Sequence, residues 1–292
     1  MGRVRNVAVA AIATVATVGV VSVVVTAQPV LTVPDAALNA TEPPLTAMSG
    51  DRTTPVIVTE AKKSPGRKGR IDRDTGSQFF AKIFTPDGAG FFCAGSLVSP
   101  RHVLTRAGCN VLPGDVVRVG GTKLFEGLRY KVQKVNAHPG FKPAGDVHDI
   151  AMLTLANPRS EAVMLRDGVA PTAGSLQLKR GYQPLRSWAE CALIFDQVRL
   201  PGSGKPLPID VQAQVCTNFG SAKSGALCQR DVGGPMFRVD TKWLGGVKTK
   251  VYTLYAVSSF WIGTAAEVCP QGLPNVGTKV AYYKRWIQAA MA

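Results

Sequence analysis

The chain has 292 residues, of which 46% are hydrophobic and 18% charged, and it contains 30 glycines and 20 prolines. This composition excludes a disordered chain and a coiled coil, and it is typical of a β-rich globular protein with many turns. Lysine and arginine number 34 against 19 acidic residues, which gives a net charge of +15 and favours acidic partners. The excess is spread along the chain without a nucleic-acid recognition motif, so we expect no specific nucleic-acid partner.

Residues 1–27 have the pattern of a signal peptide. Arg3 and Arg5 precede an uncharged apolar run over residues 7–25, and small residues suited to cleavage follow. The run is also close to the length of a bilayer span, so a retained signal anchor is the alternative. We predict a secreted, extracellular protein, and six cysteines fit disulfides formed in such a compartment.

The next segment, residues 28–76, lacks hydrophobic periodicity and is rich in proline, threonine, alanine and charge. We predict a disordered linker or pro-segment there. It carries a candidate glycosylation sequon at Asn39. A basic stretch over residues 62–73 is either a processing site or a solvated linker, and we favour the linker.

From residue 77 to 292, short apolar runs alternate with glycine, proline and aspartate, which predicts an all-β domain. The runs cover residues 79–84, 95–98, 116–119, 130–135, 150–155, 251–257 and 276–280. At the end of the chain, apolar residues recur at helical spacing and predict one C-terminal helix. These residues are Tyr282, Trp286, Ile287 and Ala290.

Cysteine and histidine spacing gives no sign of a metal site. The chain has no Cys-x-x-Cys pair, and its three histidines lack zinc-ligand spacing. We therefore expect no metal and no cofactor, and we interpret His102, His138 and His148 as structural residues.

Three segments together carry a specific signal. Residues 92–109 read Phe-Cys-Ala-Gly-Ser-Leu-Val-Ser-Pro-Arg-His-Val-Leu-Thr-Arg-Ala-Gly-Cys, residues 148–153 read His-Asp-Ile-Ala-Met-Leu, and residues 228–235 read Cys-Gln-Arg-Asp-Val-Gly-Gly-Pro. In this order the chain resembles the trypsin-like, chymotrypsin-fold serine proteases from about residue 78 to its end. The resemblance implies two six-stranded Greek-key β-barrels and a C-terminal α-helix. The chain between Leu155 and Cys191 is shorter than in the family, which leaves open whether the second barrel is complete.

The family cleaves peptides with a serine activated by a histidine, which an aspartate orients. The resemblance places these three roles at Val232, Gly108 and Asp149. Glycine has no imidazole to act as a base, and valine has no oxygen to act as a nucleophile. We therefore predict a pseudoenzyme, or pseudoprotease, that keeps only Asp149, and we expect this carboxylate near solvent.

The resemblance also implies a degraded substrate cleft. Arg230 stands at a glycine of the oxyanion hole, where a side chain disfavours the required backbone conformation. Ala226 stands at the base of the primary pocket, and Asn275 replaces a glycine of the pocket wall. The family's disulfides map to Cys93–Cys109, Cys191–Cys216 and Cys228–Cys269.

Within this family the chain resembles the glucanase inhibitor proteins of oomycetes, which are secreted trypsin homologues with broken triads. The run Ser99-Pro100-Arg101-His102-Val103-Leu104-Thr105, without a histidine before Cys109, carries this resemblance. It implies an effector that inhibits a host secreted endo-β-1,3-glucanase.

Three alternatives remain open: a basic pseudoprotease that binds polyanions or membranes, a cofactor of a protease cascade and, least favoured, an active endopeptidase. By position alone, we expect Arg106, Gly108, Arg230 and Phe260 in a partner interface around the cleft.

Overall fold

The computed structural model describes residues 46–48, 70–71, 79–142, 147–156, 179–180, 184–200, 204–217, 231–263 and 273–292. The expected signal peptide and the sequon at Asn39 lie outside these residues. So do Ala226, Cys228, Arg230 and Cys269. No helix within the described residues is long and apolar enough to cross a membrane.

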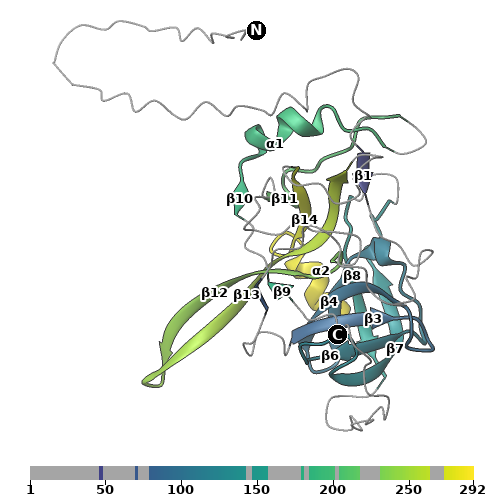
Figure 1. The fold of residues 1–292 in the computed structure, drawn as a ribbon, viewed down its shortest axis with the longest axis vertical. Helices are drawn as coiled ribbons and strands as arrows, with labels where there is room; N and C mark the ends of the chain where they lie inside the picture. The colour runs from purple at the N-terminus through teal and green to yellow at the C-terminus, as the bar shows by residue number, and fades with distance from the viewer. Residues whose placement is uncertain are drawn as a thin grey trace, which may run out of the picture. The chain divides into compact units, whose positions relative to one another are not determined.

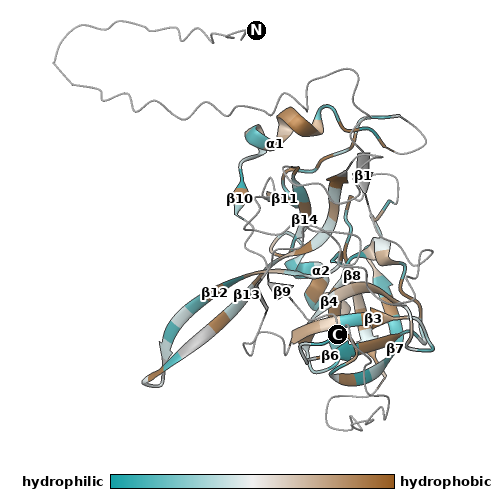
Figure 2. Cartoon of the chain, viewed as in Figure 1, coloured by the Kyte–Doolittle hydropathy of each residue, from teal (hydrophilic) through white to brown (hydrophobic). Residues whose placement is uncertain are grey.

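The first half of the domain is a closed antiparallel barrel (Figure 1). Its strands follow the order β3 (Phe80–Phe84), β4 (Phe91–Ser99), β5 (His102–Thr105), β8 (Ala151–Leu155), β7 (Leu128–Ala137) and β6 (Val116–Val119). The strands are rich in β-branched and aromatic residues, which suit a pleated backbone, and β3, β4 and β6 are largely hydrophobic in Figure 2. Buried valine, leucine and isoleucine side chains fill the interior, which excludes water from the barrel.

The second half is a six-stranded sheet that does not close among the described residues. Its strands follow the order β1 (Thr46–Met48), β13 (Val247–Gly263), β14 (Asn275–Lys279), β11 (Gln214–Thr217) and β10 (Leu185–Arg186), and β12 (Pro235–Leu244) also pairs with β13. The predicted two-barrel β fold is therefore confirmed as one closed barrel and one half-barrel. The sequence left open whether the second barrel is complete. In the part of the chain that the structure describes, the second barrel is incomplete.

Two short strands lie in the segment that the sequence predicts to be a disordered linker. β1 pairs with Trp261–Gly263 at the edge of β13, and β2 (Arg70–Ile71) pairs with β9 (Lys179–Arg180). These residues depart from the prediction because their hydrogen-bonding partners are distant in sequence, so no local periodicity signals them.

Two helices border the half-barrel and the end of the chain. The expected C-terminal helix is α2 (Lys284–Met291), whose Ile287 packs into one hydrophobic cluster with residues of β5 and β8. α1 (Trp188–Phe195) was not expected, although Ser187 begins it with a capping box: its hydroxyl accepts the Glu190 N–H, and the Glu190 carboxylate accepts the Ser187 N–H.

Two disulfides are present among the described cysteines, Cys93–Cys109 and Cys191–Cys216, as the resemblance implies. The first joins β4 to the 3-10 helix Ala107–Cys109, and the second joins α1 to β11. Disulfides of this kind are typical of chains that fold in an oxidising compartment.

Candidate functional site

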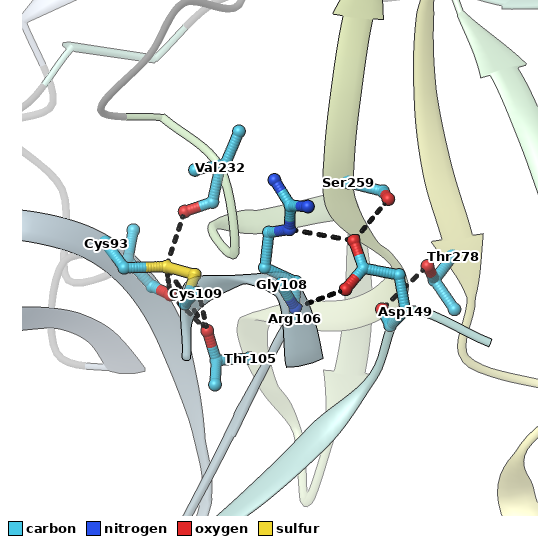
Figure 3. A network of polar contacts seen from close by, with 10 residues as sticks. Cys93, Thr105, Arg106, Gly108, Cys109, Asp149, Val232, Ser259 and Thr278 are labelled. Atoms are coloured by element: carbon cyan, nitrogen blue, oxygen red, sulfur yellow. Dashed lines mark hydrogen bonds and ion pairs between the residues drawn. A yellow bond between two sulfur atoms is a disulfide. The ribbon is translucent and has the colours of Figure 1, made fainter. Parts of the chain in front are cut away.

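The three positions that the resemblance assigns to the catalytic triad, Gly108, Asp149 and Val232, lie where the closed barrel meets the half-barrel (Figure 3). Gly108 belongs to the 3-10 helix that follows β5, Asp149 precedes β8, and Val232 precedes β12. The structure brings Gly108 and Asp149 into direct contact. Val232 reaches the same region through its carbonyl oxygen, which lies 3.3 Å from the sulfur of Cys93.

Asp149 is fully buried, so the expectation that this carboxylate lies near solvent is wrong. Its Oδ1 accepts the backbone N–H of Gly108 at 2.7 Å, and its Oδ2 accepts the Ser259 hydroxyl at 2.5 Å. Oδ2 also lies 2.8 Å from Nε of Arg106. The Thr278 hydroxyl donates to the backbone carbonyl of Asp149 at 2.9 Å, which fixes the residue against β14. Because buried carboxylates are costly unless paired, these contacts account for a charged group at this depth.

Arg106 occupies the space beside Gly108. Its side chain is 1% exposed, and a β-carbon added at Gly108 would lie 2.1 Å from its Nη2 atom. Any larger residue at position 108 would therefore require the buried guanidinium to move. A guanidinium donates hydrogen bonds but has no lone pair that accepts a proton. Arg106 thus neutralises Asp149 without supplying a general base.

Val232 belongs to the hydrophobic core of the closed barrel, in one cluster with Trp261. Its carbonyl accepts the N–H of Ala94 on β4 at 2.9 Å. The next residue, Gly233, has a φ of +79°, and a β-carbon there would lie 2.2 Å from the Ala94 carbonyl oxygen. The loop is therefore pressed against β4, and the position that the resemblance assigns to the nucleophile carries a buried aliphatic side chain.

The pocket wall is occupied by buried side chains. Asn275 on β14 lies opposite Trp261 on β13, and both are buried. The Thr217 hydroxyl of β11 donates to the Asn275 carbonyl at 3.4 Å. The pocket-base residue Ala226 and the oxyanion-hole residue Arg230 lie outside the described residues, so the resemblance alone supports their roles.

Sequence reasoning missed Arg106 and Ser259 as partners of Asp149. It also expected Arg106 and Phe260 to contact a protein partner, which is wrong because both are buried. The pairing of Arg106 with Asp149 could have been predicted, because a glycine at position 108 leaves space for a neighbouring side chain and a buried aspartate needs a cation. Nothing in the sequence pattern marks Ser259, because its contact depends on the register of β13.

The histidines make structural contacts. Nδ1 of His102 lies 2.8 Å from the Ser99 hydroxyl. His138 stacks on His148 with ring centroids 4.9 Å apart, and Nδ1 of His148 lies 2.8 Å from the hydroxyl of Tyr283. Among the described residues, no group of three or more histidine, cysteine, aspartate or glutamate side chains could hold a metal ion.

Comparison with known families identifies the class of protein. The family described as Trypsin matches residues 68–287, and the chain therefore belongs to the trypsin family. The match begins within the segment expected to be a linker, close to β2.

Individual relatives agree with this assignment. A trypsin of Saccharopolyspora erythraea is 31% identical over 232 residues, which cover 70% of this chain and 89% of the relative. Glucanase inhibitor protein 3 of Phytophthora infestans is 28% identical over 220 residues, covering 68% of this chain and 77% of the relative. The proclotting enzyme of Tachypleus tridentatus is 28% identical over 237 residues, but the match spans only 58% of that protein's length. A solved structure of kallikrein-related peptidase 10 in complex with Zn²⁺ is 23% identical, with a TM-score of 0.48, and the match covers 74% of this chain and 96% of that chain.

Proposed function

We propose that this chain is a trypsin-family protein without peptidase activity, and that it acts by binding a secreted protein. The observation that carries the first part is the ion pair between Arg106 and Asp149, which occupies the space beside Gly108. An active member needs an imidazole there to take the proton of the nucleophile. Here the carboxylate that would orient it is already neutralised by a guanidinium.

The nucleophile position supports the same proposal. Val232 offers no hydroxyl or thiol, and its side chain is buried in the barrel core. Loss of a single triad member removes most of the chemical acceleration of such an enzyme. Loss of both base and nucleophile leaves the fold as a scaffold whose function depends on its surface.

The proposed partner is a secreted endo-β-1,3-glucanase. Support comes from the likeness to glucanase inhibitor protein 3 and from glucanase inhibitor protein 4 of Phytophthora infestans, which is 39% identical over 72 residues, covering 23% of this chain and 28% of the relative. Secretion follows from the same proposal, and the two disulfides are compatible with it.

Binding of the purified protein to a secreted endo-β-1,3-glucanase, with glucanase activity followed alongside, tests this proposal. We expect a complex that persists from low to physiological ionic strength, because a shape-complementary interface depends less on salt than a polyanion contact does. Glucanase activity should fall as the complex forms.

The mass of the glucanase after incubation is the control, because an active protease would also reduce glucanase activity by cleaving it. An intact, inhibited glucanase supports the proposal. A cleaved glucanase contradicts the absence of peptidase activity, and an unbound glucanase contradicts the choice of partner.

A further inference from the structure

The β12–β13 hairpin extends beyond the rest of its sheet (Figure 1). β12 and β13 pair from Pro235 opposite Val257 to Leu244 opposite Val247, whereas β14 pairs with β13 only from Ala256 onward. The outer part of the hairpin is therefore a two-stranded ribbon. Its inner part is supported by Phe79, whose ring packs against Phe237 and Tyr252, and the ribbon continues beyond these rings to its tip.

The tip of this ribbon exposes large apolar side chains. Trp243 is 72% exposed and Val247 is 65% exposed, although a tryptophan is usually among the more buried residues of a folded protein. Gly245 and Gly246 connect the strands with φ values of 56° and 79°, as a tight type I′ turn requires. The turn keeps the two strands paired up to the tip, where Leu244 lies opposite Val247.

Exposed lysines flank the apolar tip. Lys242 precedes Trp243, and Lys248 follows Val247. From residue 241 to 263 the chain has no acidic residue and a third lysine stands at position 250. The nearest carboxylate along β12 is that of Asp240, which is held by Arg238 at 3.0 Å. The tip therefore combines apolar bulk with a local positive charge.

Each face of the ribbon tip carries both an apolar side chain and a lysine. Residues opposite one another in an antiparallel pair share a face, and neighbours along a strand alternate between faces. Trp243 therefore shares one face with Lys248, while Lys242 shares the other face with Val247. A protein surface packed against the hairpin would cover one face and leave the other exposed. A lipid layer that the hairpin enters with its tip first contacts both faces of the ribbon.

We propose that the tip of the β12–β13 hairpin is a membrane-docking site for bilayers that contain anionic phospholipid. Trp243 and Val247 enter the interfacial region, where tryptophan is favoured because its ring is apolar and its indole N–H is polar. Lys242 and Lys248 remain at the level of the head groups and bind lipid phosphate and carboxylate groups. This site is separate from the three triad positions and does not depend on the glucanase proposal.

Flotation of the full chain with vesicles tests the site. The vesicles contain phosphatidylcholine mixed with phosphatidylserine, or phosphatidylcholine alone, and we expect binding to the mixture that weakens as salt is raised. Trp243→Ala should weaken binding about tenfold, because one large buried apolar side chain is lost. Lys242→Glu with Lys248→Glu should weaken it at least about twentyfold, since each lysine near an anionic surface contributes about fivefold.

Matched control variants reverse two lysine charges or shorten one apolar side chain elsewhere on the surface. Lys131→Glu with Lys134→Glu changes the net charge equally on exposed positions of β7, and Leu193→Ala removes an exposed apolar side chain from α1. Both should bind vesicles as the unmodified chain does. Trp243→Phe should keep binding but lose the blue shift of tryptophan fluorescence that we expect when Trp243 enters the lipid.

Three outcomes would overturn the proposal. The first is an absence of binding to the anionic vesicles. The second is an equal loss of binding in the β7 double variant, which would mean that the whole basic surface binds lipid. The third is a Trp243→Ala variant that binds vesicles normally but no longer self-associates or binds glucanase, which would make the tip a protein contact.

Discussion

Arg106 and Asp149 are buried, and together with the half-buried Gly108 they form one unit in which each residue depends on the others. The carboxylate accepts the Gly108 N–H and faces the guanidinium at 2.8 Å, and the absence of a β-carbon at position 108 gives that guanidinium its space. Removing one partner of a buried ion pair is costly because the other charge stays buried without compensation. Asp149 links this unit to the half-barrel, because the Ser259 hydroxyl of β13 donates to its carboxylate and the Thr278 hydroxyl of β14 donates to its backbone carbonyl.

Arg106→Met should lower the free energy of unfolding by about 3–5 kcal/mol, because the fully buried Asp149 then loses the cation that compensates it. Adding Asp149→Asn should recover part of that loss, since the amide carries no charge. Denaturant unfolding of the two single variants and the double variant measures the coupling.

The exposed pair of Arg238 and Asp240 provides the control, since Arg238→Met should cost less than about 1 kcal/mol. Equal losses for Arg106→Met and Arg238→Met would show that burial of the Arg106 pair has no energetic consequence.

The sequence was informative about the positions of these residues and uninformative about their contacts. The motifs around Cys109 and Cys228 have fixed spacing, so the resemblance assigns the roles of the catalytic histidine and serine to the positions of Gly108 and Val232. The direction of the Arg106 side chain depends on the 3-10 helix and on the depth of Asp149, and neither follows from residue spacing. For the same reason, Arg106 was expected in a surface interface although it is buried.

Two histidines pack beside the start of helix α2. His138 stacks on His148 and contacts the rings of Tyr283 and Trp286, which lie just before α2 and within it. The Gly140 N–H donates to Nδ1 of His138 at 3.1 Å, so that nitrogen is an acceptor in the neutral ring. Burial first, and then the charge of His148, lower the pKa of the His138 imidazole below its usual value of 6.5.

The lowered pKa of His138 predicts that acid weakens the fold. The unfolded chain binds a proton more readily than the folded one, so the contribution of His138 is complete above about pH 6.5 and is lost as the pH falls through the folded pKa. His138→Gln should therefore flatten the decline of stability with acidity, which denaturant unfolding across this pH range measures.

Part of the decline should remain in His138→Gln, because burial and then Arg101 also lower the pKa of His102. A decline as steep as that of the unmodified chain would show that the histidine stack does not respond to acid.

Secondary structure was predicted best where one strand or helix carries its own pattern. The apolar runs over residues 79–84, 116–119 and 276–280 correspond to β3, β6 and β14, and the final helical spacing corresponds to α2. The length of the β12–β13 hairpin was not predicted, because β12 mixes charged and apolar residues and pairs across a turn of two glycines. α1 was missed although its Ser187 and Glu190 have the spacing of a capping box.

For the whole molecule, the resemblance predicted the two-part β architecture and two of its disulfides, while composition predicted only the class of fold. The closed barrel and the open half-barrel differ in what completes them. All six strands of the closed barrel come from residues 80–155, whereas the half-barrel recruits β1 from a segment well before it in the chain. Such long-range pairing of a three-residue strand leaves no local signal, so the linker was expected to be disordered throughout.

The central claim is that this member of the trypsin family has lost peptidase chemistry, and labelling with a fluorophosphonate tests it most directly. This reagent reacts with the activated serine of a working site, so the purified chain should remain unlabelled and should cleave no peptide, while an active trypsin is labelled under the same conditions. Intact mass and peptide mapping would locate any adduct. A labelled serine together with measurable turnover in a homogeneous preparation would contradict the account, because it would require a base and a nucleophile other than the residues at Gly108 and Val232.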